Sequence, residues 1–499
     1  MAGIQVQTSS TSTPLQNGIS SGAHEGDFLY RANCCCCCGH GVPVDLLLEY
    51  AKNIPKVELH VHVEGTLDLS LAREIGKKNG ISVGDGSEDE KAMNEDGQGI
   101  AFGDLDSFLA AYFKREKVLC NREDFHKLVL RYFEKSAAQN VRHVELFFDL
   151  QSHTRRAPAI DVVQGIYDGC CEAEQRWGIT SRRILCFVRN LPVEDHIRCV
   201  EETEPMLSMI DGFGLASSEK GNENYKFREV FDLVKKRGLP CVAHAGEEGP
   251  AQNIIDALVY NHAARIDHGS SSVENPDLLK HLVAHQIPLT VCPLSNVCLG
   301  VCRNVEEHPL LRCMPQCGLE RNTPNGVAHR EFQSQRERLR CEQLDRLKAA
   351  GQDQKNTSGV PEPVPFVAGQ TGADAIALGP KRSTGSRLGV QFESLIDQGL
   401  QVTINSDDPA YFGGGMNDNF AAIIETCLLN EKGSTGSTED DSNGGAPLRE
   451  SLHWRLDTIK TVVLNSVFAA FLPLEKKQAL AQEVEAFDAD FRKKHRIGN

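Results

Sequence analysis

The stretch KVELHVHVEGT, residues 56–66, alternates apolar and polar side chains with a period of two. On a β-strand this spacing directs four polar side chains to one face: Glu58, His60, His62 and Glu64. A single histidine on a strand is usually hydrogen-bonded or exposed and binds no metal. Two neighbouring imidazoles change that reading, because neutral imidazole is a preferred ligand of zinc. The stretch therefore predicts half of a metal site.

Three further polar clusters follow apolar runs later in the chain. They contain His244 and Glu247 in HAGEEGPA, His268 in RIDHG, and Asp407 and Asp408 in NSDDPAYFGG. Taken singly each cluster is a weak signal, because Asp-Pro and Asp-Asp pairs often mark ordinary turns. Each cluster, however, follows a run that is typical of a strand. These side chains therefore act together only if the ends of those strands meet.

The elements that must position these residues alternate between strands and helices. Helical patterns cover 123–139, 159–177 and 275–286, and two more close the chain. Eight apolar runs are typical of strands: 56–63, 141–148, 183–189, 211–217, 239–245, 263–269, 287–293 and 400–406. This order predicts an α/β fold, a (β/α)₈ TIM-type barrel with extra helices. In such a barrel the catalytic residues follow the C-terminal ends of the strands.

The barrel would bring four metal ligands to one mouth. His60, His62 and His244 supply three nitrogens, and Asp407 supplies an oxygen. Catalytic zinc sites use about three protein ligands and keep a position open for water. We therefore predict one Zn²⁺ per chain, bound by these four residues.

Three ranges differ in composition from the predicted barrel. We interpret residues 1–45 as a disordered leader and residues 313–387 as a polar, partly disordered insertion before the last strand. The metal-dependent barrel is then formed by residues 46–312 and 388–499. Residues 313–387 can be interpreted either as a regulatory or partner-binding loop or as an inert insertion.

The composition disfavours several classes of function. The 499 residues carry a formal net charge of −16, which argues against nucleic acid or an anionic membrane as a partner. No apolar run reaches the roughly 20 residues that a membrane helix needs. The start of the chain also lacks the pattern of a secretory signal. We expect a cytoplasmic protein, with the nucleus as a further location, whose 18 cysteines are free thiols. The oligomeric state stays open.

Five motifs, in this order, resemble the adenosine/adenine deaminase family of zinc purine deaminases. They are HVHVEGT, HAGEEGPAQ, RIDHG, CPLSN and NSDDPAYFGG. The resemblance covers residues 50–310 and resumes at 388, so it omits the leader and the insertion. It implies a small-molecule purine substrate and a purine-salvage reaction in which water replaces the amino group at C6 and ammonia leaves.

The resemblance also implies roles for three acid–base residues. Glu247 matches the family glutamate that protonates N1 of the purine, which requires a raised pKa. His268 matches the histidine that orients and helps to deprotonate the attacking water. Asp408 matches the carboxylate that contacts the purine. All of these residues are present in the sequence, which disfavours the alternative of an inactive barrel that binds a partner.

Glu64 bears on the choice between two substrates. Family members that act on the nucleoside typically have Asp at this position, whereas HxEG resembles the branch that acts on free adenine. The stretches ELFFDLQSHT and HAGEEGPAQ also resemble the adenine branch, particularly its fungal members. We expect the longer side chain of Glu64 to bind substrate and to occupy the space of the ribose. The resemblance therefore favours adenine, which would become hypoxanthine, with adenosine as the alternative.

Two positions depart from the adenine branch, and one more residue is a candidate. Leu150 replaces the usual Pro in FFDLQSHT, and Ala216 replaces the usual Asp in GLAS. Neither position matches a metal ligand, but we expect Ala216 to loosen the floor of the pocket. Glu219, in SSEKGN, is a further candidate for a substrate contact.

Overall fold

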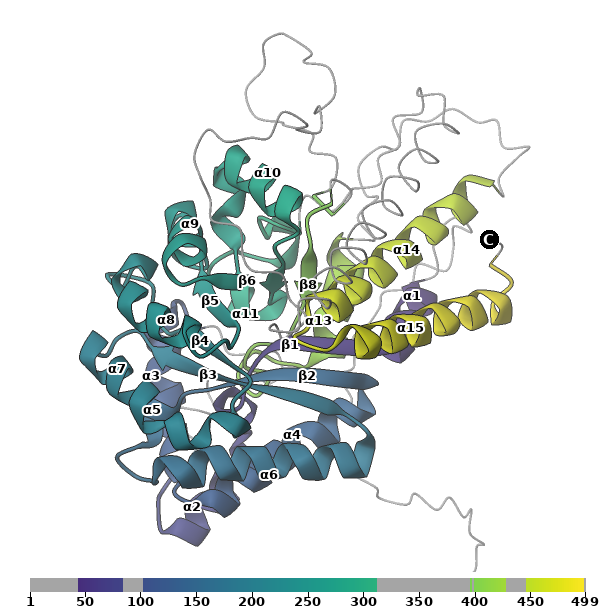
Figure 1. Cartoon of the computed structure of the whole chain (residues 1–499). Coiled ribbons are helices and arrows are strands. Elements are labelled where there is room, and N and C mark those ends of the chain that lie inside the picture. Colours follow the sequence, from purple (N-terminus) through teal and green to yellow (C-terminus); the bar gives the residue numbers. More distant parts are fainter. Residues whose placement is uncertain (1–43, 84–101, 312–394, 397–398, 428–445, 498–499) are drawn as a thin grey trace, which may run out of the picture. The chain divides into compact units, whose positions relative to one another are not determined.

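Eight parallel strands form one sheet, and their order in space is their order along the chain (Figure 1). Every neighbouring pair from the first strand to the eighth is parallel. The strands are β1 (Lys56–His62), β2 (Val141–Phe148), β3 (Thr180–Val188), β4 (Gly212–Ala216), β5 (Cys241–Ala245), β6 (Ala263–His268), β7 (Leu289–Val291) and β8 (Val402–Ile404). Helices follow the strands in sequence. The predicted (β/α)₈ barrel is therefore confirmed.

The computed structural model describes residues 44–83, 102–311, 395–396, 399–427 and 446–497. Its helices are α1 (Val44–Asn53), α2 (Leu69–Asn79), α3 (Leu105–Arg115), α4 (Arg122–Ala138), α5 (Leu150–His153), α6 (Ala159–Trp177), α7 (Val193–Glu202), α8 (Arg228–Lys235), α9 (Ala251–Tyr260), α10 (Pro276–His285), α11 (Pro293–Cys298), α13 (Met416–Cys427), α14 (Ala446–Ala469) and α15 (Leu474–Lys494). Within the described ranges, no helix combines the length and the apolar character required to cross a bilayer.

The predicted ranges agree closely with these elements. The runs 141–148 and 159–177 coincide with β2 and α6, and most of the other ranges differ from their elements by one to three residues at each end. The insertion 313–387 and the leader lie outside the described residues, except that Val44 and Asp45 begin α1.

The first and last strands meet at the residue that follows β8. Val61 forms a parallel bridge with Asp407. The Asp407 amide donates to the His60 carbonyl at 3.0 Å, and the His62 amide donates to the Asp407 carbonyl at 3.0 Å. The Leu59 amide also donates to Oδ1 of Asn405 at 2.8 Å. The barrel closes, therefore, at the place where the predicted ligands lie.

A buried ion pair fixes the interior of the barrel on the side away from these ligands. Arg265 of β6 donates through Nη1 to Oε2 of Glu145 of β2 at 2.5 Å and through Nη2 to the Leu59 carbonyl at 3.0 Å. Burial raises the pKa of Glu145, but the charge of Arg265 and the hydrogen bonds from His143 and Arg265 together outweigh burial and lower the pKa to about 2. The pair therefore stays ionised and ties β2 and β6 to β1 directly before His60.

Candidate active site

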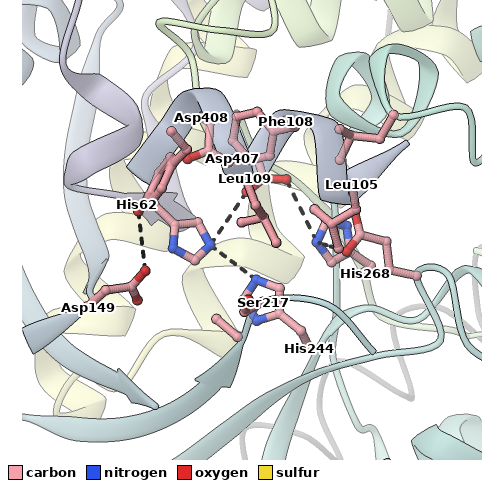
Figure 2. Close-up of a pocket in the computed structure, with 14 residues that line it drawn as sticks. His62, Leu105, Phe108, Leu109, Asp149, Ser217, His244, His268, Asp407 and Asp408 are labelled. Carbon is pink, nitrogen blue, oxygen red and sulfur yellow. Dashed lines mark hydrogen bonds and ion pairs between the residues drawn. The ribbon is translucent and has the colours of Figure 1, made fainter. Parts of the chain in front are cut away.

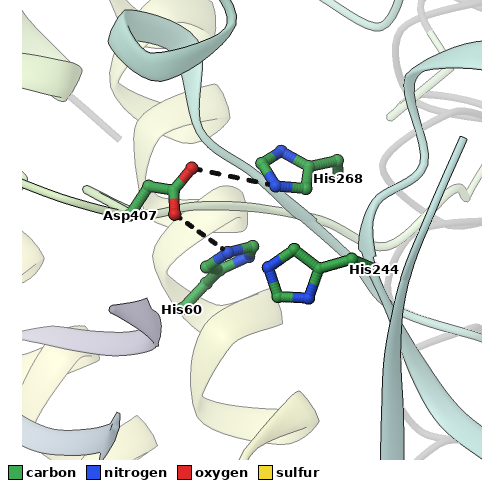
Figure 3. Close-up of side chains that lie close together, drawn as sticks. All are labelled: His60, His244, His268 and Asp407. Atoms are coloured by element: carbon green, nitrogen blue, oxygen red, sulfur yellow. Dashed lines mark ion pairs between the residues drawn. The ribbon is translucent and has the colours of Figure 1, made fainter. Parts of the chain in front are cut away.

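The four predicted ligands lie together at the C-terminal ends of the strands (Figures 2 and 3). His60 and His62 end β1, His244 lies in β5, and Asp407 follows β8. Nε2 of His60 lies 3.3 Å from Oδ1 of Asp407, and Nε2 of His62 lies 3.6 Å from the same oxygen. Nε2 of His62 is also 3.1 Å from Nε2 of His244. Four side chains from three strand ends thus converge.

The outer nitrogens of His60 and His244 face a buried network that sequence reasoning missed. Thr290 donates to Oδ1 of Asp267 at 2.8 Å, so its hydroxyl oxygen is left to accept from Nδ1 of His60 at 2.9 Å. Nδ1 of His244 lies 3.6 Å from Oδ2 of Asp267. This arrangement puts the proton of His60 on Nδ1 and turns the lone pair of Nε2 toward Asp407. Outer partners of this kind commonly orient metal-binding histidines.

The donor set fits a zinc ion. Ligand atoms of His60, His244, His268 and Asp407 all lie within 4.8 Å of one another, and His62 forms a second such group with Asp407 and Asp408. Burial lowers the pKa of His62 to about 4 and that of His244 well below its usual range, so both imidazoles are neutral at pH 7. Several neutral nitrogens with one carboxylate oxygen are the ligand type that zinc prefers.

His268 occupies a different position from the other histidines. Its Nε2 lies 3.7 Å from Oδ2 of Asp407 and 3.5 Å from Oε2 of Glu247, whereas the closest contacts of His60 and His62 are with Oδ1 of Asp407. Burial lowers the pKa of His268 to about 3. His268 and Asp407 both have left-handed backbones, with φ of 66° and 63°. Non-glycine residues rarely adopt this conformation, and it is concentrated at functional sites.

Glu247 and Asp408 are buried carboxyl groups beside this cluster. Burial, reinforced by the charge of Asp407, raises the pKa of both carboxyls well above the usual range. Burial beside another acid therefore favours the protonated form of Glu247. Gly65 approaches Asp408 so closely that a Cβ on it would lie 1.8 Å from Oδ1. Glycine is therefore required in HVEG for Asp408 to fit.

The cluster opens into a pocket (Figure 2). Residues from β1, α3, β4, β5 and β6 and from the segments that follow several strands surround it. Its lining consists of His62, Leu105, Phe108, Leu109, Tyr112, Asp149, Ala216, Ser217, His244, Glu247, His268, Leu299, Asp407 and Asp408. An apolar wall facing a few polar groups is typical of a site for a small aromatic ligand.

Sequence reasoning missed the apolar wall and placed Ala216 correctly at the pocket. Leu105, Phe108 and Tyr112 lie on α3, which carries no catalytic motif, although an apolar residue recurs along it at helical spacing. Ala216 ends β4 and does line the pocket. Leu150 is fully buried at the start of α5 and lies outside the lining.

Glu64 lies behind the pocket wall and not in its lining. Its Oε1 accepts from Nε2 of His153 at 2.8 Å and from the Asp149 amide at 3.1 Å. The Tyr112 hydroxyl donates to its Oε2 at 3.4 Å. The strand ends at His62, and Glu64 begins a 3₁₀ turn, Glu64–Thr66. That turn, which sequence periodicity did not predict, places the carboxylate against His153 and the Asp149 amide.

Glu219 also lies outside the pocket lining, where it organises the loop that carries Glu247. Its Oε2 accepts from the amides of residues 247, 248 and 249 at 2.9, 3.0 and 2.9 Å. Its Oε1 accepts from the Gly246 amide and from Nδ2 of Asn253, both at 2.9 Å. One buried carboxylate thus receives five hydrogen bonds. The expected substrate contact is replaced by a structural one.

Comparisons with known proteins agree with this geometry. A family model described as adenosine deaminase matches residues 55–316. A curated adenine deaminase of Chlorobium phaeobacteroides is 35% identical over 441 residues, which cover 88% of this chain and 98% of the relative. The crystal structure of an adenine deaminase from Arthrobacter aurescens matches with a TM-score of 0.62 and 28% identity, covering 87% of this chain and 98% of that one.

A more distant match shares the fold. An amidohydrolase from Burkholderia ambifaria, solved with bound Zn, has a TM-score of 0.61 and 18% identity and covers 91% of this chain and 97% of its own. The extent of the family match and the identity to the Chlorobium relative together decide the assignment. This chain belongs to the adenosine deaminase family.

Proposed function

We propose that this protein is a zinc-dependent adenine deaminase, which converts adenine and water to hypoxanthine and ammonia in purine salvage. The observation that carries the proposal is the pairing of a buried carboxyl with a raised pKa, Glu247, with a nitrogen-rich cluster that can hold a metal, beside an apolar pocket wall. The relatives named adenine deaminase, which match along almost their whole length, support adenine as the substrate.

One zinc ion would be held by His60, His62, His244 and Asp407. Both β1 histidines approach Oδ1 of Asp407, and His244 lies against His62, which supports these four residues as the ligand set. His268 approaches the other oxygen of Asp407 and is left free for acid–base work. When bound, zinc supplies Lewis acidity that makes water a nucleophile at neutral pH.

The acid–base steps belong to residues of the chain. His268, a neutral imidazole next to Asp407 and Glu247, accepts a proton from the water that attacks C6. Glu247 donates its proton to N1, so that the ring accepts the electron pair displaced by the new C–O bond. Asp408, buried beside Asp407 and also raised in pKa, binds the purine at the same end of the pocket. The amino group then takes the proton held by His268 and leaves as ammonia, while the hydroxyl on C6 returns a proton to Glu247 and becomes the carbonyl of hypoxanthine.

Glu64 contributes to the preference for the free base in this proposal. Its carboxylate holds the backbone of Asp149 and the side chain of His153 behind the wall that faces the rest of the substrate. Glu64→Asp would shorten this support by one methylene and is expected to raise activity on adenosine relative to adenine. Adenosine is the second candidate substrate, since the matching family model carries that name.

Assays of the purified chain against adenine and adenosine in parallel test the assignment. We expect kcat/KM for adenine to exceed that for adenosine by at least about 10³, because a closed wall rejects the ribose. Equal or greater efficiency on adenosine would overturn adenine as the substrate and leave the fold and metal site standing. We further propose that the enzyme works in the cytoplasm on a small purine, without a nucleic-acid or membrane partner.

A further inference from the structure

Asp149 is a pocket residue that the catalytic steps above do not use. It directly follows β2, is 5% exposed and lines the pocket. Figure 2 shows it across the pocket from His268, with His62 between them. The Tyr112 hydroxyl donates to its Oδ2 over a long 3.4 Å. Its Oδ1 is buried and has no hydrogen-bond partner among the described residues.

The basic side chains near Asp149 bind other acids. His153 donates to Glu64 at 2.8 Å, and Arg156 donates through Nη2 to Oε1 of Glu116 at 3.0 Å. Burial and the charges of Glu64 and Glu116 raise the pKa of Asp149 well above its usual range. A buried oxygen without a partner is costly, so such groups usually acquire one when the site is filled. The backbone of Asp149 is meanwhile fixed by Glu64.

The orientation of the substrate suggests that partner. If Glu247 meets N1 and the metal cluster meets C6, the five-membered ring of the purine points to the opposite end of the pocket. There the free base presents the N9–H donor beside the N3 acceptor, whereas a nucleoside has a ribose carbon on N9. A single acceptor at this place would therefore discriminate the free base from the nucleoside in two ways: it accepts a hydrogen bond from N9–H, and it leaves no space for a ribose.

We propose that Asp149 is the specificity-determining residue for the free base, and that its unpaired Oδ1 accepts the hydrogen bond from N9–H of the purine. This role rests on the proposed function for the orientation of the substrate. It also explains how Glu64 affects specificity from behind the wall, since Glu64 positions the backbone of Asp149.

Adenine and 9-methyladenine, which lacks N9–H, distinguish this role from a structural one. A site built to bind an N–H typically rejects the analogue without it by about 10⁴ or more. We expect the wild-type kcat/KM for adenine to exceed that for 9-methyladenine by at least about 10³. Asp149→Ala should lower kcat/KM for adenine by about 10², and its preference for adenine over 9-methyladenine should shrink to about tenfold or less. Asp149→Asn keeps an acceptor oxygen and should retain most of the discrimination.

Glu116→Gln is the matched control, because Glu116 belongs to the same buried acidic group but lies outside the pocket lining. It should leave the ratio unchanged. A wild type that accepts 9-methyladenine as well as adenine, or an Asp149→Ala variant that keeps the wild-type ratio, would overturn the proposal. Calorimetry can compare the affinities for hypoxanthine and 9-methylhypoxanthine, which differ in the same N9–H group and need no turnover. A failure of the proposed reaction can therefore be distinguished from a failure of this contact.

Discussion

Replacing Glu219 with Gln tests whether one buried carboxylate holds the loop of the proton donor. The carboxylate accepts five hydrogen bonds, four of them from the consecutive amides of residues 246–249. An amide side chain keeps one acceptor oxygen, which fits the three donors at Oε2. Its NH₂ group would then face the Gly246 amide and Asn253, both of which are donors in the wild type.

The magnitude follows from these contacts. Asn253 can present its own carbonyl to the new NH₂ group, so one bond is recovered and the Gly246 amide stays unpaired. A hydrogen bond to a charged group contributes about 1.5–3 kcal/mol, and its loss is concentrated in the loop that carries Glu247. If the competent loop arrangement is disfavoured by that amount, kcat falls about 10- to 100-fold. The zinc content should stay the same, because the predicted ligands lie outside this loop.

We would measure kcat on adenine by steady-state kinetics, zinc content by metal analysis and the stability of the fold by a thermal melt. Glu248→Gln is the matched control, because it lies in the same loop but its side chain pairs with the half-exposed Lys220 at 2.8 Å. The Glu248 side chain is only 8% exposed, but Lys220 is 55% exposed, so solvent screens the pair and we expect it to contribute about 0–1 kcal/mol and kcat to change less than about threefold. A Glu219→Gln enzyme with normal zinc and more than half of the wild-type kcat would refute the reasoning.

Four further outcomes follow from the site. Glu247→Gln should bind zinc and fold normally yet lose about 10²–10⁴ in kcat, because an amide cannot protonate N1; retention of a tenth of the activity would require another acid. Protein purified without chelator should contain one zinc per chain, and His60→Gln should contain far less by metal analysis, whereas active protein without metal would contradict the site. The kcat/KM of the wild type should be level where the site histidines are neutral and fall as pH rises through the raised pKa of Glu247, since only the protonated form donates; Glu219→Gln should move that fall to lower pH, because the charge of Glu219 helps to raise this pKa. Replacing residues 315–385 with a short Gly/Ser bridge should keep activity, because longer loops add little closure entropy, and a variant that fails to fold would show that the segment is needed.

The fold and the metal cluster were predictable because both depend on local patterns. Strand periodicity placed His60 and His62 on one face, and the rule that barrel sites follow strand ends brought in His244 and Asp407. Alternating strands and helices predicted the barrel without reference to any contact between distant residues. These inferences need the spacing of side chains and the topology of the fold. The sequence contains the spacing directly, and the rules for connecting strands strongly restrict the topology.

The contacts that the sequence did not reveal depend on turns and on tertiary neighbours. Period-two alternation continued to Glu64 in the prediction, but the 3₁₀ turn that starts there rotates its carboxylate toward Asp149. Glu219 follows β4, and its five donors follow β5, so its role exists only once those strands are neighbours. Tyr112 reaches the pocket from a helix between β1 and β2, for which no catalytic motif exists.

The closure of the barrel at Asp407 also constrains how the enzyme is made. The hydrogen bond between Leu59 and Asn405 joins residues 346 positions apart, and the oxygen ligand lies just beyond it. While the ribosome is still translating the middle of the chain, the nascent protein has three imidazoles but no carboxylate to complete the centre. Metal loading can then be completed only after β8 emerges and docks on β1. Retention of zinc would therefore indicate that the chain is fully synthesised and that β8 has docked on β1 to close the barrel.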